Sequence, residues 1–365
     1  MKVLHISSAK TFGGGERHLI DLTRGMTQRG HEIFVALRPT NVWQEKLDFL
    51  PPENFLHVSI RNSFGMFSAK RIANFIREKN IEIVHAHVGR DYIPASVACR
   101  IAKTAKFVLT RHVLFPMKPF HRYALTNVER AIAVSSAVEV NLQNIFPKRK
   151  IALIPNGIEI AHDLENKQKL REAFRFLHNI PSDAPLIGTV GELKILKGQR
   201  DFVLAANEIA KSFPNAHFVI VGKDNGVNKP FRRELKRLVK VFELEKRFLF
   251  LDWIEDMSEL LAALDIFVSA SHSESFGLAI LEAMTNETAI VATETEGAKE
   301  LLQTGETAMI VPIKNALEIA KAVESLLKDR KKSETFGKNA RIFAQKNFSL
   351  EKMIERTSDL YREIL

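Results

Sequence analysis

The chain has 365 residues, of which 45% are hydrophobic and 26% are charged, as in a globular protein large enough for two domains. It contains no apolar run of 18 or more residues, so a membrane-spanning helix is not expected. Residues 1–180 carry 27 Lys and Arg against 15 Asp and Glu, and residues 181–365 carry 26 against 28, so the net charges are +12 and −2.

Short apolar runs alternate with amphipathic stretches along the chain, which is the pattern of parallel α/β sheets. In the first half, the predicted strands are Val3–Ser7, Ile33–Leu37, Phe55–Ile60, Ile83–His87, Phe107–Thr110, Ala131–Ser135 and Ile151–Pro155. The helices between them include one from the Gly13-Gly14-Gly15 loop to about Gly30, Ser68–Lys79 and Ile93–Ala102.

A polar segment, Asn156–Pro185, is predicted to be a linker with one helix, Lys167–Phe176. The second alternation has predicted strands at Leu186–Val190, His217–Val221, Arg247–Leu251, Ile266–Ser269, Ala289–Thr293 and Ala308–Val311. Its predicted helices are Arg200–Phe213, Phe231–Phe242, Met257–Ala263, Leu278–Met284, Ala298–Gln303 and Leu317–Lys328, and the charged stretch Glu334–Leu365 is also helical. The sequence therefore predicts two doubly wound domains, with ligands at the carboxyl ends of their strands.

The most informative string is Glu274-Ser-Phe-Gly-Leu-Ala-Ile-Leu-Glu282, which follows a buried strand and opens a helix. The amide groups of Ser275, Phe276 and Gly277 fall where helix starts bind anions. Glu282 lies about two helical turns beyond Glu274, so the two acids can meet separate parts of one elongated ligand.

This string resembles the E-x7-E signature of retaining glycosyltransferases that use nucleotide sugars, and the chain as a whole resembles glycosyltransferase family 4. The resemblance implies a GT-B fold, in which two Rossmann-like domains face each other across a cleft. It implies an acceptor domain over residues 1–160, a nucleotide-sugar domain over 161–345, and a last helix, about 346–365, that packs back on the first domain.

The resemblance also implies a role for individual residues. Glu274 would meet the hydroxyls of the donor sugar and, with His112, would be catalytic, and Glu282 would bind the ribose. The donor would further be bound by Gly14, Gly15, Lys197, Ile254, Ser275, Phe276, Gly277 and Leu278. Trp253 is an alternative to Ile254 beside the nucleobase.

One position departs from the family pattern. The family usually has an arginine directly after the glycine that opens the second-domain motif, whereas Gly191 is followed here by Glu192. Lys197 is present, and Lys194 or Arg200 is a candidate for the second cation that the diphosphate needs.

Two patterns bear on metal ions. His85 and His87 form a His-x-His pair that is one signature of a metal site, but no carboxylate or cysteine completes it in the sequence, so a structural or cleft-lining role is favoured. The chain has no Asp-x-Asp motif, so we expect a metal-independent enzyme with no cofactor, whose donor is a UDP-, GDP- or ADP-sugar.

The basic first half indicates an anionic partner. The candidates are a glycan or lipid-linked acceptor, an anionic membrane surface reached through the basic N-terminal domain or the amphipathic stretch 70–79, and nucleic acid, for which no recognition motif is present. The single cysteine, Cys99, fits a reducing compartment, so we expect a cytoplasmic protein at the inner face of the membrane. An epimerase of the same shape is the alternative enzyme.

Overall fold

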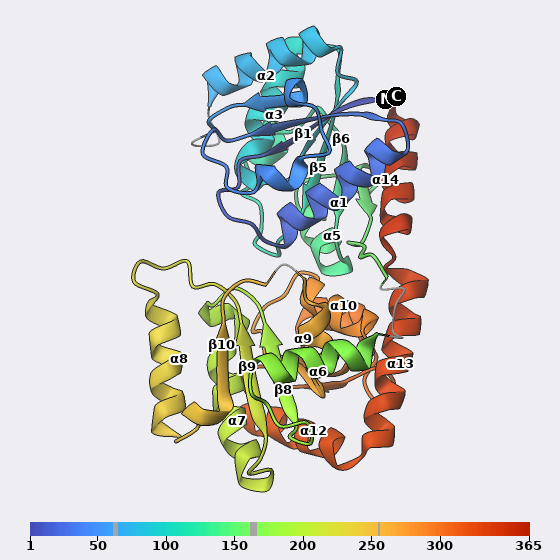
Figure 1. The fold of residues 1–365 in the computed structure, drawn as a ribbon. Coiled ribbons are helices and arrows are strands. Elements are labelled where there is room, and N and C mark those ends of the chain that lie inside the picture. The colour runs from blue at the N-terminus through green and yellow to red at the C-terminus, as the bar shows by residue number, and fades with distance from the viewer. Residues whose placement is uncertain (61–64, 161–165, 255) are drawn as a thin grey trace. The chain divides into compact units, whose positions relative to one another are not determined.

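The structure is a computed structural model that describes residues 1–60, 65–160, 166–254 and 256–365 (Figure 1). The chain divides into two compact units. Unit 1 comprises Met1–Glu159 and Phe348–Leu365, and unit 2 comprises Ile160–Asn347. Residues 161–165 of the predicted linker lie outside the described residues.

Unit 1 contains a seven-stranded parallel sheet in the order β3-β2-β1-β4-β5-β6-β7. The strands are β1 (Lys2–Ser7), β2 (Glu32–Leu37), β3 (Phe55–His57), β4 (Ile83–Ala86), β5 (Lys106–Arg111), β6 (Val128–Ala133) and β7 (Ile151–Leu153). The helices are α1 (Gly14–Gln28), α2 (Met66–Lys79), α3 (Tyr92–Ala102), α4 (His121–Ala124), α5 (Ser136–Gln143) and α14 (Leu350–Ile364).

Most of the predicted strands have slightly different bounds in the structure, and two of the differences are informative. The third strand ends at His57 and not at Ile60, because its partner strand β2 ends at Leu37, which pairs with His57. The sixth strand ends at Ala133 and not at Ser135. Ser135 instead caps helix α5, with its hydroxyl accepting a hydrogen bond from the Val138 amide.

Helix α2 contains the amphipathic stretch 70–79, whose apolar side could face either a membrane or the core. In the structure this side is buried in the core. Ile72 and Ile76 are fully buried, and Phe75 packs edge-on against Phe34 of β2. The basic residues of this helix lie on its other side. The apolar residues of the stretch 70–79 therefore pack in the core of unit 1 and do not form a membrane-binding surface.

Helix α14 belongs to unit 1 although it ends the chain, and it packs against α1 (Figure 1). Tyr361 of α14 is fully buried, and Ile354 lies so close to Gly25 of α1 that a side chain at position 25 would clash with it. Helix α14 therefore closes one side of the unit 1 core.

Unit 2 contains a six-stranded parallel sheet in the order β10-β9-β8-β11-β12-β13. The strands are β8 (Leu186–Val190), β9 (His217–Val221), β10 (Phe248–Leu251), β11 (Ile266–Ser269), β12 (Ala289–Thr293) and β13 (Met309–Val311). The helices are α6 (Lys167–Leu177), α7 (Gln199–Ser212), α8 (Pro230–Val241), α9 (Ser258–Ala263), α10 (Leu278–Thr285), α11 (Glu296–Leu301), α12 (Ala316–Lys328) and α13 (Arg330–Asn347).

Each sheet reverses its strand order once. In unit 1 the reversal lies between β1 and β4, and in unit 2 it lies between β8 and β11. Open parallel sheets bind ligands beyond the carboxyl ends of the strands at such switch points, because the loops there diverge to opposite faces of the sheet. The fold thus predicts one ligand-binding edge in each unit.

Among the described residues, no helix combines the length and the apolar character needed to cross a membrane.

Candidate active site

Lys197 and Glu274 meet at the switch point of unit 2. Lys197 ends the turn that follows β8, and Glu274 lies in the loop that follows β11. The Lys197 ammonium donates a hydrogen bond to Glu274 Oε2, and their side chains are only 25% and 16% exposed. The cation and the first acid of the predicted pair are therefore neighbours, although 77 positions separate them in the chain.

The two loops that carry this ion pair are in direct contact through their backbones. Gly198 has φ +66°, and a Cβ at this position would lie 1.8 Å from the carbonyl oxygen of Ala270. Only glycine satisfies both the left-handed backbone and the close approach. Gly198 therefore lets the Lys197 turn lie against the chain leading to Glu274.

His272 and Asp201 form a second link between the same loops, which the sequence analysis did not identify. The His272 amide donates to the Leu196 carbonyl at 2.8 Å, and its ring Nε2 lies 2.6 Å from Asp201 Oδ2 in the first turn of α7. Both side chains are about 15% exposed or less. No local pattern marks this pair, because its partners lie in two separate connections that come together only through the pairing of β8 with β11 in the sheet.

The Glu274–Gly277 loop is fixed by its neighbours before it enters α10. Gly277 adopts φ +105°, and α10 begins at Leu278. Phe276 is buried, and the Gly297 amide donates to the Glu274 carbonyl at 2.9 Å. The start of α10 is therefore held in place with its first amide groups at the carboxyl edge of the sheet.

The remaining predicted residues of unit 2 lie at the same edge of the sheet. Ser275 and Glu282 are half-buried, in the Glu274–Gly277 loop and in α10 respectively. Ile254 is half-buried and follows β10, and its neighbour Trp253 is 46% exposed.

Glu192, where the family has arginine, accepts hydrogen bonds from Lys194 at 2.6 Å and Asn225 at 3.0 Å. Partial burial opposes its ionisation, but these two donors and the nearby lysines together lower the pKa of Glu192. Lys194 is thus already paired with an acid, and Arg200 lies 3.7 Å from Glu234. Both candidates for a second phosphate-binding cation have a carboxylate partner in this structure.

In unit 1, the glycine loop and His112 lie together at the switch point. Helix α1 begins at Gly14, directly after β1 and the loop, and His112 follows β5. A Cβ on Gly15 would lie 3.7 Å from the His112 ring, so the helix start packs on that ring. The structure thus brings together Gly14 and Gly15, which were predicted to bind the donor, and His112, which was predicted to be catalytic.

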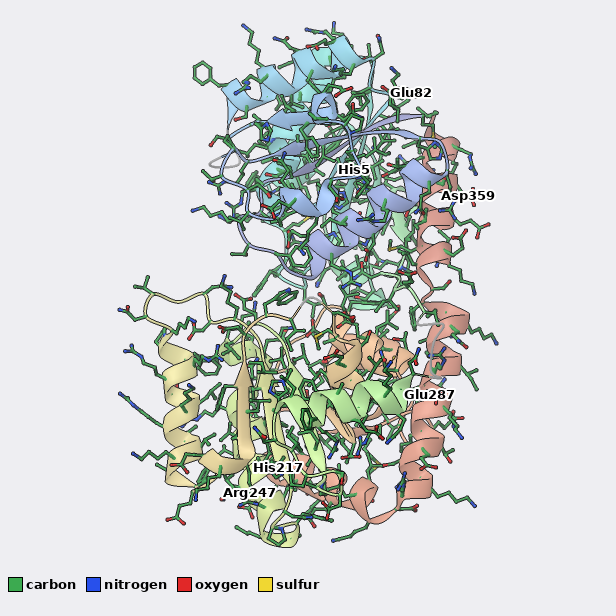
Figure 2. The ribbon with its side chains drawn as sticks, in the orientation of Figure 1. His5, Glu82, His217, Arg247, Glu287 and Asp359 are labelled. Atoms are coloured by element: carbon green, nitrogen blue, oxygen red, sulfur yellow. The ribbon has the colours of Figure 1, made fainter. Side chains whose placement is uncertain are left out.

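His112 is the partly buried member of a histidine cluster, comprising His5, His18, His85, His87 and His112, whose other members are buried. His5 Nδ1 lies 3.0 Å from His87 Nε2, and Figure 2 shows His5 within unit 1. The rings of His18 and His112 meet edge to face with centroids 4.8 Å apart. His85, His87 and His112 could be singled out from the sequence, and His5 and His18 join them only through the fold.

The histidine cluster is uncharged at neutral pH. Burial lowers the pKa of His5 to about 3 and that of His18 to about 4, and it holds the pKa of each of the other three well below the ordinary value. Neighbouring imidazoles lower the pKa of His85 and His87 further, because a second positive charge at this spacing would be repelled.

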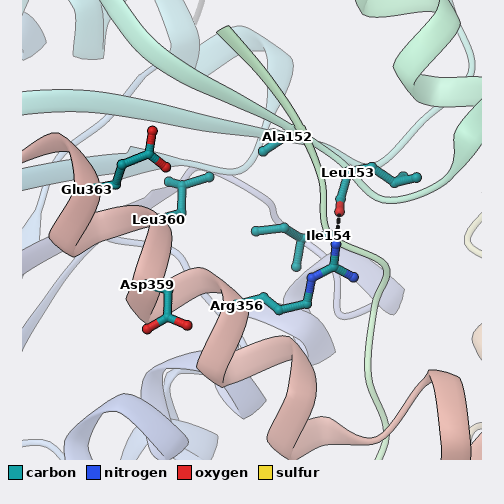
Figure 3. Close-up of a pocket in the computed structure, with 7 residues that line it drawn as sticks. All are labelled: Ala152, Leu153, Ile154, Arg356, Asp359, Leu360 and Glu363. Carbon is teal, nitrogen blue, oxygen red and sulfur yellow. Dashed lines mark hydrogen bonds between the residues drawn. The ribbon is translucent and has the colours of Figure 1, made fainter. Parts of the chain in front are cut away.

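The pocket in Figure 3 lies between β7 and α14 and is separate from these residues. Arg356 of α14 donates a hydrogen bond to the Leu153 carbonyl across it at 2.7 Å. It contains none of the predicted site residues.

Comparisons with known proteins place these observations in a family. Residues 171–343 match the family model described as glycosyl transferases group 1, and residues 12–162 match that of glycosyltransferase family 4. The N-acetyl-alpha-D-glucosaminyl L-malate synthase of Bacillus anthracis is 24% identical, over 94% of this chain and 92% of its own length. The lipopolysaccharide core biosynthesis glycosyltransferase LpsE of Rhizobium meliloti is 25% identical, over 90% and 89%.

Solved structures of similar shape cover the chain from end to end. HepE of Anabaena in complex with UDP has a TM-score of 0.86 at 21% identity and covers all of both chains. A glycosyltransferase of Rickettsia africae has a TM-score of 0.87 at 23% identity, over 100% of this chain and 98% of its own.

Two parallel α/β units with these structural neighbours define the GT-B fold of glycosyltransferases, as the sequence predicted. The chain belongs to glycosyltransferase family 4, and the protein is a glycosyltransferase.

Proposed function

We propose that this glycosyltransferase transfers a sugar from a nucleoside-diphosphate sugar to a glycan or lipid-linked acceptor, with retention of the anomeric configuration. The observation that carries the donor assignment is the contact of Lys197 with Glu274, in the loop that leads into α10, at the switch point of unit 2. Such a site offers one cation and several amide donors to a diphosphate. The HepE structures, described as complexes with UDP and with UDP-glucose, support a donor of this class.

The donor would bind along the carboxyl edge of unit 2. Glu282 accepts hydrogen bonds from the ribose, and Ile254 lies beside the base. Ser275, Phe276, Gly277 and Leu278 offer backbone amides to the phosphates, and Glu274 meets the sugar hydroxyls. For unit 1, the resemblance to the family suggests donor binding by Gly14 and Gly15 and a catalytic role for His112.

In the transfer step, the bond between the anomeric carbon and the phosphate oxygen breaks as the acceptor oxygen bonds to the same face of that carbon. The acceptor proton passes to the departing phosphate. Lys197 and the amides at the start of α10 stabilise the negative charge that develops on the diphosphate, and we infer that no metal ion is needed for this neutralisation.

Before the donor binds, the Lys197 ammonium is already paired with the Glu274 carboxylate. Donor phosphates must therefore displace Glu274 from the ammonium, which leaves the carboxylate able to accept hydrogen bonds from the sugar. We infer that this exchange couples occupation of the diphosphate site to the positioning of Glu274.

The acceptor side of the proposal depends on the charge and surface of unit 1. Unit 1 carries 26 Lys and Arg against 16 Asp and Glu, a net charge of +10, whereas unit 2 carries 27 of each. The segment after His112, residues 113–123, exposes Phe115 and Tyr123 beside Lys118 and Arg122. Apolar and basic groups side by side suit an amphiphilic anionic acceptor and the surface of an anionic membrane.

Relatives support an acceptor of this class. One is named as a lipopolysaccharide core biosynthesis glycosyltransferase and another, from Escherichia coli, as a galactosyltransferase acting on a diphosphoundecaprenol-linked sugar. The named relatives give no support to the epimerase or the nucleic-acid alternative.

The donor assignment is tested first by ligand-induced stabilisation. The unmodified protein is screened against UDP-, GDP- and ADP-sugars by thermal shift, because a ligand that binds the folded state raises the unfolding temperature. Transfer with the best donor is then compared in Lys197→Ala and Glu282→Ala. For Lys197→Ala we expect kcat/KM to fall by about 10²–10³-fold, the usual loss on removing one group that stabilises developing charge.

Lys211→Ala is the control, because Lys211 lies in the last turn of α7, away from the Lys197 turn, and is also paired with a carboxylate, Glu208. Unchanged donor kinetics in both Lys197→Ala and Glu282→Ala would refute the donor assignment.

The membrane assignment is tested by cosedimentation with vesicles of phosphatidylcholine alone or with phosphatidylglycerol. We expect binding to the anionic vesicles only, with loss of binding when Phe115→Ser and Arg122→Gln are combined. Phe176→Ser is the control, because Phe176 is a phenylalanine on unit 2 that is even more exposed than Phe115. Equal binding to both kinds of vesicle, or no effect of the combined variant, would count against this surface.

A further inference from the structure

The histidine cluster contains more imidazoles than the proposed transfer reaction uses. Of the cluster, only His112 has a role in the proposed reaction, yet four buried histidines from β1, α1, β4 and the residue after β4 belong to the same cluster. The ring of His87 lies 5.8 Å from that of His112 and 4.1 Å from that of His85, measured between centroids. Imidazoles are costly to bury, so a group of five at one switch point calls for an explanation.

Two triads in this cluster bring their ring nitrogens within 4.8 Å of one another. One is His5, His85 and His87, and the other is His18, His87 and His112. In the first triad both nitrogens of His85 are already engaged, one with the Tyr361 hydroxyl and the other with Thr110 Oγ1 at 2.7 Å. A ligand there would have to break one of these hydrogen bonds.

In the second triad, one ring nitrogen of His87 can bind a ligand without the loss of a hydrogen bond. His87 Nε2 is hydrogen-bonded to His5, and His87 Nδ1 is buried with no hydrogen-bond partner among the described residues. A histidine whose one nitrogen is fixed by a neighbour presents the other in a defined direction, as metal-binding histidines do. His5 therefore acts on His87 as an orienting partner.

We propose that His18, His87 and His112 form a binding site for a borderline divalent transition metal of the Zn²⁺ class. Three neutral imidazole nitrogens with an open fourth position are an established ligand set for such ions. His112 is only partly buried, whereas His18 and His87 are buried, so it is the member of the triad that lies nearest to solvent.

This site is distinct from the diphosphate site in its residues and its chemistry. The triad contains no carboxylate and lies in unit 1, whereas the residues proposed to bind the diphosphate belong to unit 2. Binding of an ion does not depend on the proposed function. One consequence does rest on that function: an ion on His112 occupies a side chain proposed to be catalytic, so Zn²⁺ should inhibit transfer.

The test is metal stoichiometry on the intact protein. The protein is treated with EDTA, dialysed, titrated with Zn²⁺ at pH 7.5 and assayed for bound zinc by elemental analysis. We expect one Zn²⁺ per chain, and at least about a 100-fold loss of affinity in His18→Ala and in His112→Ala, since even the loss of an orienting partner costs roughly 10–100-fold.

His57→Ala is the control, because His57 is an exposed histidine on β3 outside the cluster, hydrogen-bonded to Gln44. Circular dichroism checks that each variant is folded. If the buried His18→Ala does not fold, His112→Ala decides together with the visible absorption of Co²⁺ added to the unmodified protein, which reports nitrogen ligation without any substitution.

Absence of stoichiometric zinc, or zinc binding that survives in His112→Ala and disappears in His57→Ala, overturns the proposal. If zinc binds as expected but no sugar nucleotide is used, the proposed function fails and the metal site stands.

Discussion

The two switch points of this protein hold their polar groups in opposite ways. In unit 1 the polar groups are imidazoles that burial keeps neutral, whereas in unit 2 they are charges that neutralise one another, as in Lys197 with Glu274 and Lys194 with Glu192. A buried neutral base is sensitive to protons, and a paired charge is sensitive to ions that compete for its partner. The same sheet topology thus offers two different kinds of response.

The largest expected effect is acid destabilisation of unit 1. The pKa values of His5 and His18 are about 3 and about 4 in the folded protein, against 6.5 for an ordinary histidine. Below pH 6.5 the unfolded chain takes up protons that the folded cluster refuses, so stability is full above pH 6.5 and is lost as the pH falls toward 4. At pH 5 each residue costs about 2 kcal/mol, together about 4 kcal/mol.

This prediction is checked by urea unfolding of the EDTA-treated protein at pH 7 and pH 5. In a Trp253→Phe background the remaining tryptophan is Trp43, which is buried in unit 1 and reports on that unit. A Trp43 transition of unchanged midpoint and slope at the two pH values would show that the cluster is not held neutral by burial.

The next largest effect is the loss of stability when a side chain is added at Gly198, where two loops of unit 2 touch. Gly198→Ala should lower the free energy of unfolding by about 3 kcal/mol, because the new Cβ meets the Ala270 carbonyl in addition to the strained backbone. Gly305→Ala is the matched control, since Gly305 has φ +79° with nothing within 4 Å of its Cβ, and should cost about 1 kcal/mol. Equal losses in the two variants, measured by denaturant unfolding, would mean that the backbone contact is unimportant.

A smaller effect separates binding from catalysis in unit 2. Glu274→Gln removes the carboxylate that competes with phosphate for Lys197, so a nucleoside diphosphate should bind more tightly, by about fivefold or roughly 1 kcal/mol. Transfer should nevertheless be slower, because Glu274 is assigned to the donor sugar. Calorimetry with the nucleotide that best stabilises the protein measures the first effect, and weaker binding would contradict the competition.

The smallest effect concerns the interior of unit 1 away from the histidines. Cys99 in α3 is 4% exposed, and burial raises the pKa of its thiol to about 12. We expect no reaction with a thiol-specific disulfide reagent in the native protein at pH 8 and one thiol per chain in urea. Rapid labelling of the native protein would show that α3 opens easily and that unit 1 is less tightly closed than its burial indicates.

The local sequence pattern was sufficient to predict the architecture of both units and much of the candidate site in unit 2. Apolar runs bounded by glycine and polar turns predicted the strands, and parallel strands place their carboxyl ends at one edge, so Lys197 and Glu274 could be expected there. The length of β3 was missed because it depends on where its partner strand ends. The pairing of His272 with Asp201 was missed because it joins two separate crossovers.

By itself, the sequence determined two doubly wound domains through its alternation of strands and helices, and the string from Glu274 to Glu282 supplied the resemblance that implied the GT-B fold and the glycosyltransferase class. Only the tertiary structure decided that the His-x-His pair at 85 and 87 is part of a larger cluster. His5 comes from the neighbouring strand, His18 from the first helix and His112 from the end of β5, and no spacing along the chain relates them. Side chains far apart in sequence become ligands of one site only when a sheet aligns its strand ends, and that alignment is a property of the whole fold.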